Sequence, residues 1–182
     1  MVRRKVYTKD QILKASYNII LREGFSGITA RNVADKMGIS TQPIYLEFKN
    51  MEDLKVSLLL QIYGELENHY YSRQATGDPV IDMGLNVVEL AKKDRRLFMY
   101  LYIDSHGYGD MLRKLSYEKL EKQTQLSEKY QELSEEILAD IYEKIWITAA
   151  GIATLLATDA IMMTDQEISE ALKESIQKYS FS

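Results

Sequence analysis

Apolar residues recur at intervals of three and four along most of this chain, and polar capping signals bound the segments in which they do so. This spacing is typical of amphipathic α-helices, because residues three and four apart share one helical face. The 182 residues include only two prolines, which stop helices, and few stretches alternate between polar and apolar residues as a strand would. The sequence therefore predicts an all-α fold.

Two helices are expected near the N-terminus, each with its own start and stop signals. Thr8 and Gln11 have the spacing of a capping box, and the helix that they begin is expected to end at Gly24. Thr29 is expected to cap a second, short helix that ends at Gly38, since glycine readily adopts the left-handed conformation that closes a helix. These signals place a tight turn directly after Gly38.

A third helix is expected from about Thr41 to Phe48, with Ser40 as its cap and Pro43 in its first turn, where proline costs little. Two short helices joined by a tight turn, with a small residue such as Ala34 where they cross, form a helix-turn-helix. In that motif the second helix enters the major groove of DNA. Many all-helical cores also contain such a pair, so the pattern by itself is not specific.

The charge is divided unevenly along the chain. Residues 1–50 carry nine Lys or Arg and four Asp or Glu, a net charge of +5, whereas residues 51–182 carry a net charge of −9. A basic N-terminal region followed by an acidic remainder is typical of a protein that binds nucleic-acid phosphates through one surface, although chance segregation could give the same two net charges. This division favours a small N-terminal DNA-binding domain.

Several short motifs between Thr8 and Leu54 sharpen this interpretation. They are Thr29-Ala30-Arg31-Asn32-Val33-Ala34, Gly38-Ile39-Ser40, Ile44-Tyr45, Phe48-Lys49-Asn50 and Glu52-Asp53-Leu54. This stretch, about a quarter of the chain, resembles the N-terminal domain of the tetracycline-repressor family. The resemblance implies a three-helix, helix-turn-helix DNA-binding domain in residues 1–50 and a helical bundle for effector binding and dimerisation in residues 51–182.

The resemblance also implies phosphate contacts for Thr29, Tyr45 and Lys49. A helix N-terminus, a phenolic hydroxyl and an ammonium group are all suited to that role. Met51 stands where many members of the family have a lysine, and Lys55 is a candidate substitute. For Tyr45 a second role, as a half-buried core aromatic, stays open.

Contacts with the edges of the bases would be made by the exposed face of the third helix, which carries Thr41, Gln42, Leu46 and Glu47. This helix has no cation before Lys49, so guanine reading by arginine is not expected. Gln42 is suited to adenine, Thr41 or Leu46 to a thymine methyl group, and Glu47 to the amino group of cytosine. Glu47 can equally be a solvated residue that makes no base contact.

Three cations, Arg3, Arg4 and Lys5, precede the first helix. Basic arms of other helix-turn-helix proteins lie along phosphates or enter the minor groove. This segment can act in the same way, or it can be a solubilising tail.

Six further segments have helical periodicity and end at capping or breaking residues. They run from Asn50 to about Tyr70, from Asp78 to about Lys93, from Asp94 to about Ile103, around Met111 and Leu115, from about Ser134 to Ala160, and from Thr164 to about Tyr179. The segment from Asp94 is apolar on all sides, which predicts central burial. The stretch from Leu120 to Glu132 is too polar to assign.

The longest uncharged run, Ile145 to Thr158, has 14 residues and is rich in Ala and Gly. It is shorter than the roughly 20 residues that a membrane-spanning helix needs, so no membrane partner is expected. The family resemblance implies that the last two long helices of each subunit pack as a four-helix interface in a homodimer. Burial of the same face within one subunit is the alternative.

An effector pocket is expected among the helices of the body. Its candidate lining residues are aromatic, Met or His side chains: Tyr63, Phe98, Tyr102, His106, Met111 and Trp146. Such side chains at helical spacing are also common in plain cores, so the sequence leaves both roles open.

Together these features predict a cytoplasmic regulator of transcription that binds double-stranded DNA, most simply a repressor released from a near-palindromic operator by a small-molecule effector. We expect no catalysis and no cofactor, since the chain has no cysteine, two histidines and no phosphate-binding glycine motif. Asp104, His106 and Asp110 could hold a metal, but their glycine-rich surroundings suit a mobile loop better. A helical interaction scaffold or an unrecognised enzyme is the alternative function.

Overall fold

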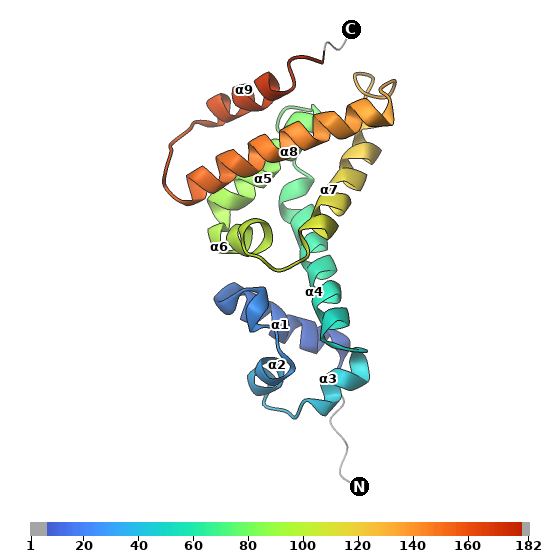
Figure 1. The fold of residues 1–182 in the computed structure, drawn as a ribbon, viewed down its shortest axis with the longest axis vertical. Coiled ribbons are helices and arrows are strands. Elements are labelled where there is room, and N and C mark those ends of the chain that lie inside the picture. Colours follow the sequence, from blue (N-terminus) through green and yellow to red (C-terminus); the bar gives the residue numbers. More distant parts are fainter. Residues whose placement is uncertain (1–6, 180–182) are drawn as a thin grey trace. The chain divides into compact units, whose positions relative to one another are not determined.

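The computed structural model describes residues 7–179, and its regular structure in that range consists of helices only (Figure 1). The all-α prediction is therefore confirmed. The chain forms two compact units, of which the first ends at Glu65 and the second begins at Leu66. The functional boundary expected after residue 50 stays a prediction. No helix within residues 7–179 has the length and apolar character needed to cross a membrane.

The first unit is built on three helices, α1 (Lys9–Glu23), α2 (Ala30–Met37) and α3 (Gln42–Glu47), and α1 packs against the other two. A short 3-10 turn, Phe25–Gly27, links α1 to α2, and α4 (Met51–Leu66) follows α3. The core side chains of this unit are almost completely inaccessible to solvent: Ile12, Ile20, Ile28, Val33, Ala34, Ile44, Phe48 and Leu54. The expected apolar stripes therefore do form one core.

The capping residues explain where these helices begin. Thr8 and Gln11 form the complete capping box, and the Thr29 hydroxyl accepts a hydrogen bond of 3.1 Å from the backbone N–H of Asn32. At the third helix the prediction is wrong, because Thr41 and not Ser40 stands at the N-cap, without a side-chain cap. Pro43 has no N–H and the N–H of Ile44 donates to the Thr41 carbonyl, so a hydroxyl cap would find few donors there.

The second unit is arranged around α5 (Pro79–Lys93), which lies along α8 (Glu135–Ala157) (Figure 1). The helices α6 (Arg95–Phe98), α7 (Gly109–Thr124) and α9 (Asp165–Ser175) also pack against α5. Two π-helical segments complete the unit, η2 (Glu67–Tyr71) directly after α4 and η3 (Met99–Ile103) directly after α6. At Gly84 the helices approach so closely that a Cβ atom would lie 2.8 Å from the side chain of Leu172 on α9.

Two sequence predictions for this unit are corrected. The segment after Asp94 is not buried on all sides: Leu97, Phe98 and Leu101 are buried, but 42% of Ile103 is exposed because this segment packs through one face. The last helix ends at Ser175 rather than near Tyr179.

The loop between η2 and α5 is held by two buried polar side chains of α5. The Asp82 carboxylate accepts hydrogen bonds from the backbone N–H of Thr76 (2.8 Å), from its hydroxyl (2.8 Å) and from the N–H of Gly77 (3.1 Å). Asn86 donates its side-chain N–H to the carbonyl of Arg73 at 3.1 Å. Since only 4% of each of these two side chains is exposed, the loop backbone replaces the water that they lose.

We expect Asp82→Ala to lower the free energy of unfolding by about 1 to 3 kcal/mol, because it leaves three donors of the loop without their acceptor. Chemical denaturation followed by circular dichroism would measure the change. Asp110→Ala is the control, since the Asp110 side chain is 91% exposed and lies 3.9 Å from Arg113 in a surface ion pair. Equal stability of the two variants would contradict a stabilising role for the Asp82 contacts.

Candidate nucleic-acid interface

A tight turn between α2 and α3 sets the position of α3 in the first unit. Gly38 has φ +67° and ψ +39°, and the N–H of Ile39 donates to the carbonyl of Ala34 at 3.0 Å, which closes α2. Ala34 is 3% exposed, and Ile44 of α3 is 1% exposed. The two helices are thus fixed by a left-handed glycine, a small buried residue and one apolar anchor, the arrangement of a helix-turn-helix.

The opposite side of α3 is open to solvent. Thr41, Gln42, Tyr45, Leu46 and Glu47 are all exposed, with 52% of Tyr45 and 73% of Leu46 accessible. An exposed leucine next to an exposed tyrosine is unusual on a six-residue helix whose other apolar residue, Ile44, is buried. The side chains of α3 and its N-cap that were predicted to contact DNA are therefore all accessible to solvent.

A reciprocal cap positions Lys49 between α3 and α4. The N–H of Lys49 donates to the Asp53 carboxylate at 3.0 Å, and the N–H of Asp53 donates to the side-chain oxygen of Asn50 at 2.8 Å. The Lys49 side chain is exposed, whereas Lys55, one turn into α4, is half-buried. Of the two lysines, Lys49 is therefore more accessible to a phosphate group.

Thr29 is exposed at the start of α2, and its hydroxyl oxygen is occupied by the cap to Asn32. The hydroxyl hydrogen remains able to donate, and the first amides of α2 face outward from the helix end. The predicted basic arm, Arg3 to Lys5, lies outside the described residues.

Arg31 is an exposed cation of this unit that sequence reasoning did not assign to the DNA contacts. Arg31 lies in the first turn of α2, its side chain is 89% exposed, and its Nε is 3.8 Å from the Asp35 carboxylate in an i,i+4 pair. Such a surface pair is weak, so Arg31 can exchange Asp35 for a phosphate at little cost. Its position two residues after the Thr29 cap was the sequence signal that could have identified it.

The residues predicted to line an effector pocket lie in both units. Tyr63 belongs to the first unit, and the other five belong to the second. Of these five, the structure brings together Phe98 and Tyr102, whose rings stack with their centroids 5.2 Å apart. Phe98 is completely buried, as in a plain core.

The hydroxyl of Tyr102 contacts a residue that sequence reasoning missed. It shares a hydrogen bond of 2.8 Å with the hydroxyl of Tyr71, so the two π-helical segments η2 and η3 are directly joined. Burial raises the pKa of Tyr102 above its usual value, and the hydrogen bond from Tyr71 opposes this shift. The Tyr102 hydroxyl therefore stays neutral at physiological pH and can donate as well as accept.

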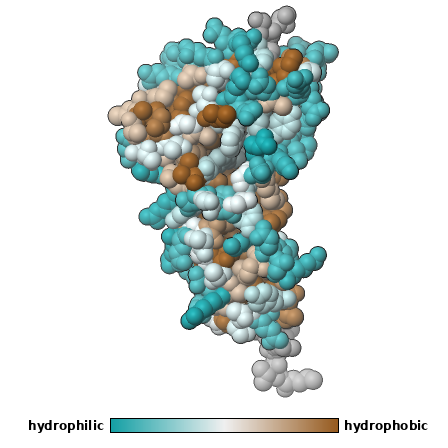
Figure 2. All heavy atoms as spheres, in the orientation of Figure 1, coloured by the Kyte–Doolittle hydropathy of each residue, from teal (hydrophilic) through white to brown (hydrophobic). Residues whose placement is uncertain are grey.

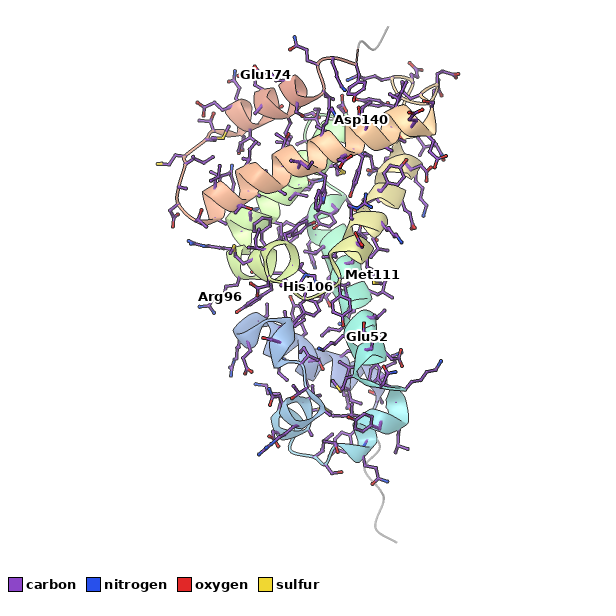
Figure 3. The ribbon with its side chains drawn as sticks, in the orientation of Figure 1. Glu52, Arg96, His106, Met111, Asp140 and Glu174 are labelled. Atoms are coloured by element: carbon purple, nitrogen blue, oxygen red, sulfur yellow. The ribbon has the colours of Figure 1, made fainter. Side chains whose placement is uncertain are left out.

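Two further candidates, His106 and Met111, lie close to each other in sequence, in the loop before α7 and in its first turn (Figure 3). The Nδ1 of His106 accepts from the N–H of Tyr108 at 3.0 Å, and its Nε2 lies 2.8 Å from the Leu101 carbonyl. This pattern places the proton on Nε2 and gives the ring a structural role in the loop. Met111 and Trp146 are half-buried.

Two surface cavities of the second unit flank the loop between η2 and α5. One, of about 300 Å³, is lined by residues that include Arg73, Asn86, Lys92 and Asp165. The other, of about 240 Å³, includes Tyr71 and the same Arg73 and Asn86. None of the six predicted pocket residues lines either of these two cavities, and the pocket assignment stays a prediction. Among the described residues, no group of three or more His, Cys, Asp or Glu side chains could hold a metal ion.

Comparison with known proteins places these features in a family. Residues 12–58, which include α2, the turn and α3, match the family described as bacterial regulatory proteins, tetR family. No curated protein sequence matches the chain.

Two solved structures share the fold. One is a transcriptional regulator of the TetR family from Vibrio parahaemolyticus, with 19% identity, a TM-score of 0.64, and coverage of 93% of this chain and 97% of that one. The other is the fatty acid degradation regulator FadR from Bacillus halodurans, with 18% identity, a TM-score of 0.53, and coverage of 96% and 95%. At such low identities the structural similarity shows the fold alone, whereas the match of residues 12–58 concerns the DNA-binding motif itself. Through that motif, the chain contains a DNA-binding domain similar to that of the tetR family of bacterial regulatory proteins, which supports a DNA-binding regulator of transcription.

Proposed function

We propose that this regulator is a cytoplasmic repressor, which binds a near-palindromic operator as a homodimer and is released by a small apolar or aromatic molecule. The observation that carries the proposal is the accessible face of α3, on which residues suited to base contact stand beside the exposed Lys49. A helix held in this way by a helix-turn-helix can enter the major groove while its neighbours contact the backbone.

Within this proposal the side chains divide into two groups. Thr29, Tyr45, Lys49 and Lys55 hold the phosphates, which positions the domain without reading sequence. Thr41, Gln42, Leu46 and Glu47 face the base edges and supply specificity. Arg31 is a further candidate for the phosphate group, because its exposed guanidinium lies in the first turn of α2.

The proposed dimer forms through α8 and α9. On α8, Ile147, Gly151 and Leu155 follow one another at intervals of four, so they share a helical face, and 58% of Ile147 and 44% of Leu155 are exposed. No charged residue occurs from position 145 to 158. Figure 2 shows hydrophobic atoms gathered on the surface over the C-terminal half of α8 and its connection to α9. An uncharged face with a glycine at its centre suits close packing against a second copy.

The proposed effector acts on α4 through the segment that follows it. Tyr71 ends η2, which continues α4 directly, and its hydroxyl bonds to Tyr102 in η3. A ligand that contacts Tyr102 can therefore compete for this hydrogen bond and change the end of α4. Two half-sites must match the protein spacing at about 34 Å per DNA turn, so a small movement of α4 in each subunit can cost operator affinity.

Selection of genomic fragments with the purified full-length protein tests the proposed function. A recovered motif with two-fold symmetry and a half-site spacing near one DNA turn or a multiple of it is expected. An asymmetric motif would contradict the dimeric mode of binding, and the absence of any preferred duplex would contradict operator recognition.

The double variant Tyr45→Phe, Lys49→Ala is expected to weaken binding to all duplexes alike. The negative slope of log affinity against log salt concentration should become less steep by about 1, because one fewer counterion is released. Fluorescence anisotropy over a series of salt concentrations measures both quantities. Lys114→Ala removes an exposed lysine of α7 and is the matched control. A slope unchanged from that of the control would remove Lys49 from the phosphate contacts.

A further inference from the structure

The reading face of α3 is unusual in its chemistry. The helix Gln42–Glu47 contains no cation, and its most exposed apolar side chain is Leu46, with 73% of its surface accessible. Leu46 lies four positions after Gln42, which places these two exposed side chains one above the other on the same helical face. An amide and an aliphatic side chain are thus presented together.

We propose that Leu46 recognises the 5-methyl group of thymine beside an adenine read by Gln42, so that operator affinity depends on pyrimidine 5-methyl groups. This inference rests on the proposed contact of α3 with base edges.

The argument follows from what the major groove offers. Among the groups that base pairs present there, the thymine methyl is the apolar one, and every other recognition group is a hydrogen-bond donor or acceptor. Leucine has no hydrogen-bonding group, so it can discriminate between bases only through apolar contact. A leucine that faced a polar base edge would displace water from the polar groups of that edge and would offer them no hydrogen bond in return.

Gln42 supplies the second half of the recognition. Its side-chain amide can donate to N7 and accept from the N6 amino group of adenine, the pairing for which glutamine is suited. An A·T pair carries the adenine N6 and N7 groups and the thymine methyl group on the same groove edge. Because Gln42 and Leu46 are separated by one helical turn, they can contact the same A·T pair or two adjacent ones. The expected half-site therefore contains A·T pairs where α3 enters the groove.

The test uses the full-length protein and the duplex recovered by fragment selection, with each thymine in turn replaced by uracil, which lacks only the methyl group. We expect one position in each half-site at which uracil weakens binding about fourfold, the effect of returning one methyl group to water. Substitution in both half-sites should multiply the effect to about sixteenfold. 5-Bromouracil, in which bromine takes the place of the methyl group, should restore the affinity.

Leu46→Ala should bind thymine and uracil duplexes equally at that position. The exposure of Leu46 means that its loss should leave the melting temperature unchanged, which circular dichroism verifies. Leu126→Ala is the matched control, because Leu126 is 89% exposed in the turn after α7 and should keep the full preference for thymine.

Each outcome bears on one claim. Equal affinity for thymine and uracil at every position overturns the methyl readout while DNA binding itself stands. A uracil effect that persists undiminished in Leu46→Ala overturns the role of Leu46. Failure to prefer any duplex is a different result, since it concerns the proposed function and leaves no operator to substitute.

Discussion

Replacing Ile147 and Leu155 with glutamate is expected to dissociate the proposed homodimer into monomers and to weaken operator binding by about a hundredfold or more. Both side chains are exposed on the uncharged face of α8, one turn on either side of Gly151. The glutamates of one subunit would face those of the other across the symmetric interface with no cation to pair with, which costs several kcal/mol. A monomer contacts one half-site, so the avidity that comes from two linked DNA-binding domains is lost.

Sedimentation equilibrium would measure the subunit state, and anisotropy with full and half operators would measure the affinity. The wild-type protein should prefer the full operator strongly, whereas the double variant should bind full and half operators with similar affinity. Leu126→Glu, which places the same charge on an exposed leucine in the turn after α7, should leave both measurements unchanged. A dimeric Ile147→Glu, Leu155→Glu variant would show that the subunits associate through another surface.

The helices of the first unit were predictable because their signals are local. The Thr8 and Gln11 pair, the Thr29 cap and Gly38 act within four residues of their own position, and each is found in its expected role. Ser40 failed as a cap for a local reason as well, since Pro43 removes a donor that the cap would have served. The accessible face of α3 also followed from its helical period, because Ile44 alone had to point inward.

The second unit was less predictable, because contacts between distant residues decide its details. The hydroxyls of Tyr71 and Tyr102 meet although 31 positions separate them, and each belongs to a π-helical segment. A π-helix shifts the helical register by one residue, and no residue pattern in the sequence marks such a shift. Tyr71 was therefore absent from the predicted pocket residues, while its partner Tyr102 was among them.

The burial of the polar residues of α5 also depends on contacts that the local sequence does not reveal. Asp82 and Asn86 are four positions apart, which suggests a solvent-facing side of an amphipathic helix. In the structure they are buried, because the loop of residues 72–78 lies over them and supplies their hydrogen bonds. The backbone donors of that loop are not encoded by any single side chain, so the pattern of α5 alone could not identify its buried polar face.

Phe48→Ala is expected to destabilise the first unit by about 3 to 5 kcal/mol, the usual range for removing a buried aromatic ring. Phe48 is 2% exposed, so its buried ring anchors the end of α3 to the core. Its backbone N–H donates to the carbonyl of Ile44 at 3.0 Å and closes the helix. The Lys9 ammonium lies 4.9 Å from the centre of the ring and adds a cation–π contact. A unit of this size has a net stability of only a few kcal/mol, so α3 should lose its fixed position and DNA binding should disappear.

Hydrogen exchange of the α1, α2 and α3 amides would measure the loss of stability, and anisotropy would measure DNA binding. Tyr45→Ala separates the two effects, because this exposed ring should cost DNA affinity while the exchange rates remain those of the wild-type protein. Phe48→Leu should retain most of the protection, since leucine refills much of the space that the ring occupies. If Phe48→Ala kept wild-type exchange rates but lost DNA binding, Phe48 would act at the DNA surface, and the packing account of α3 would be wrong.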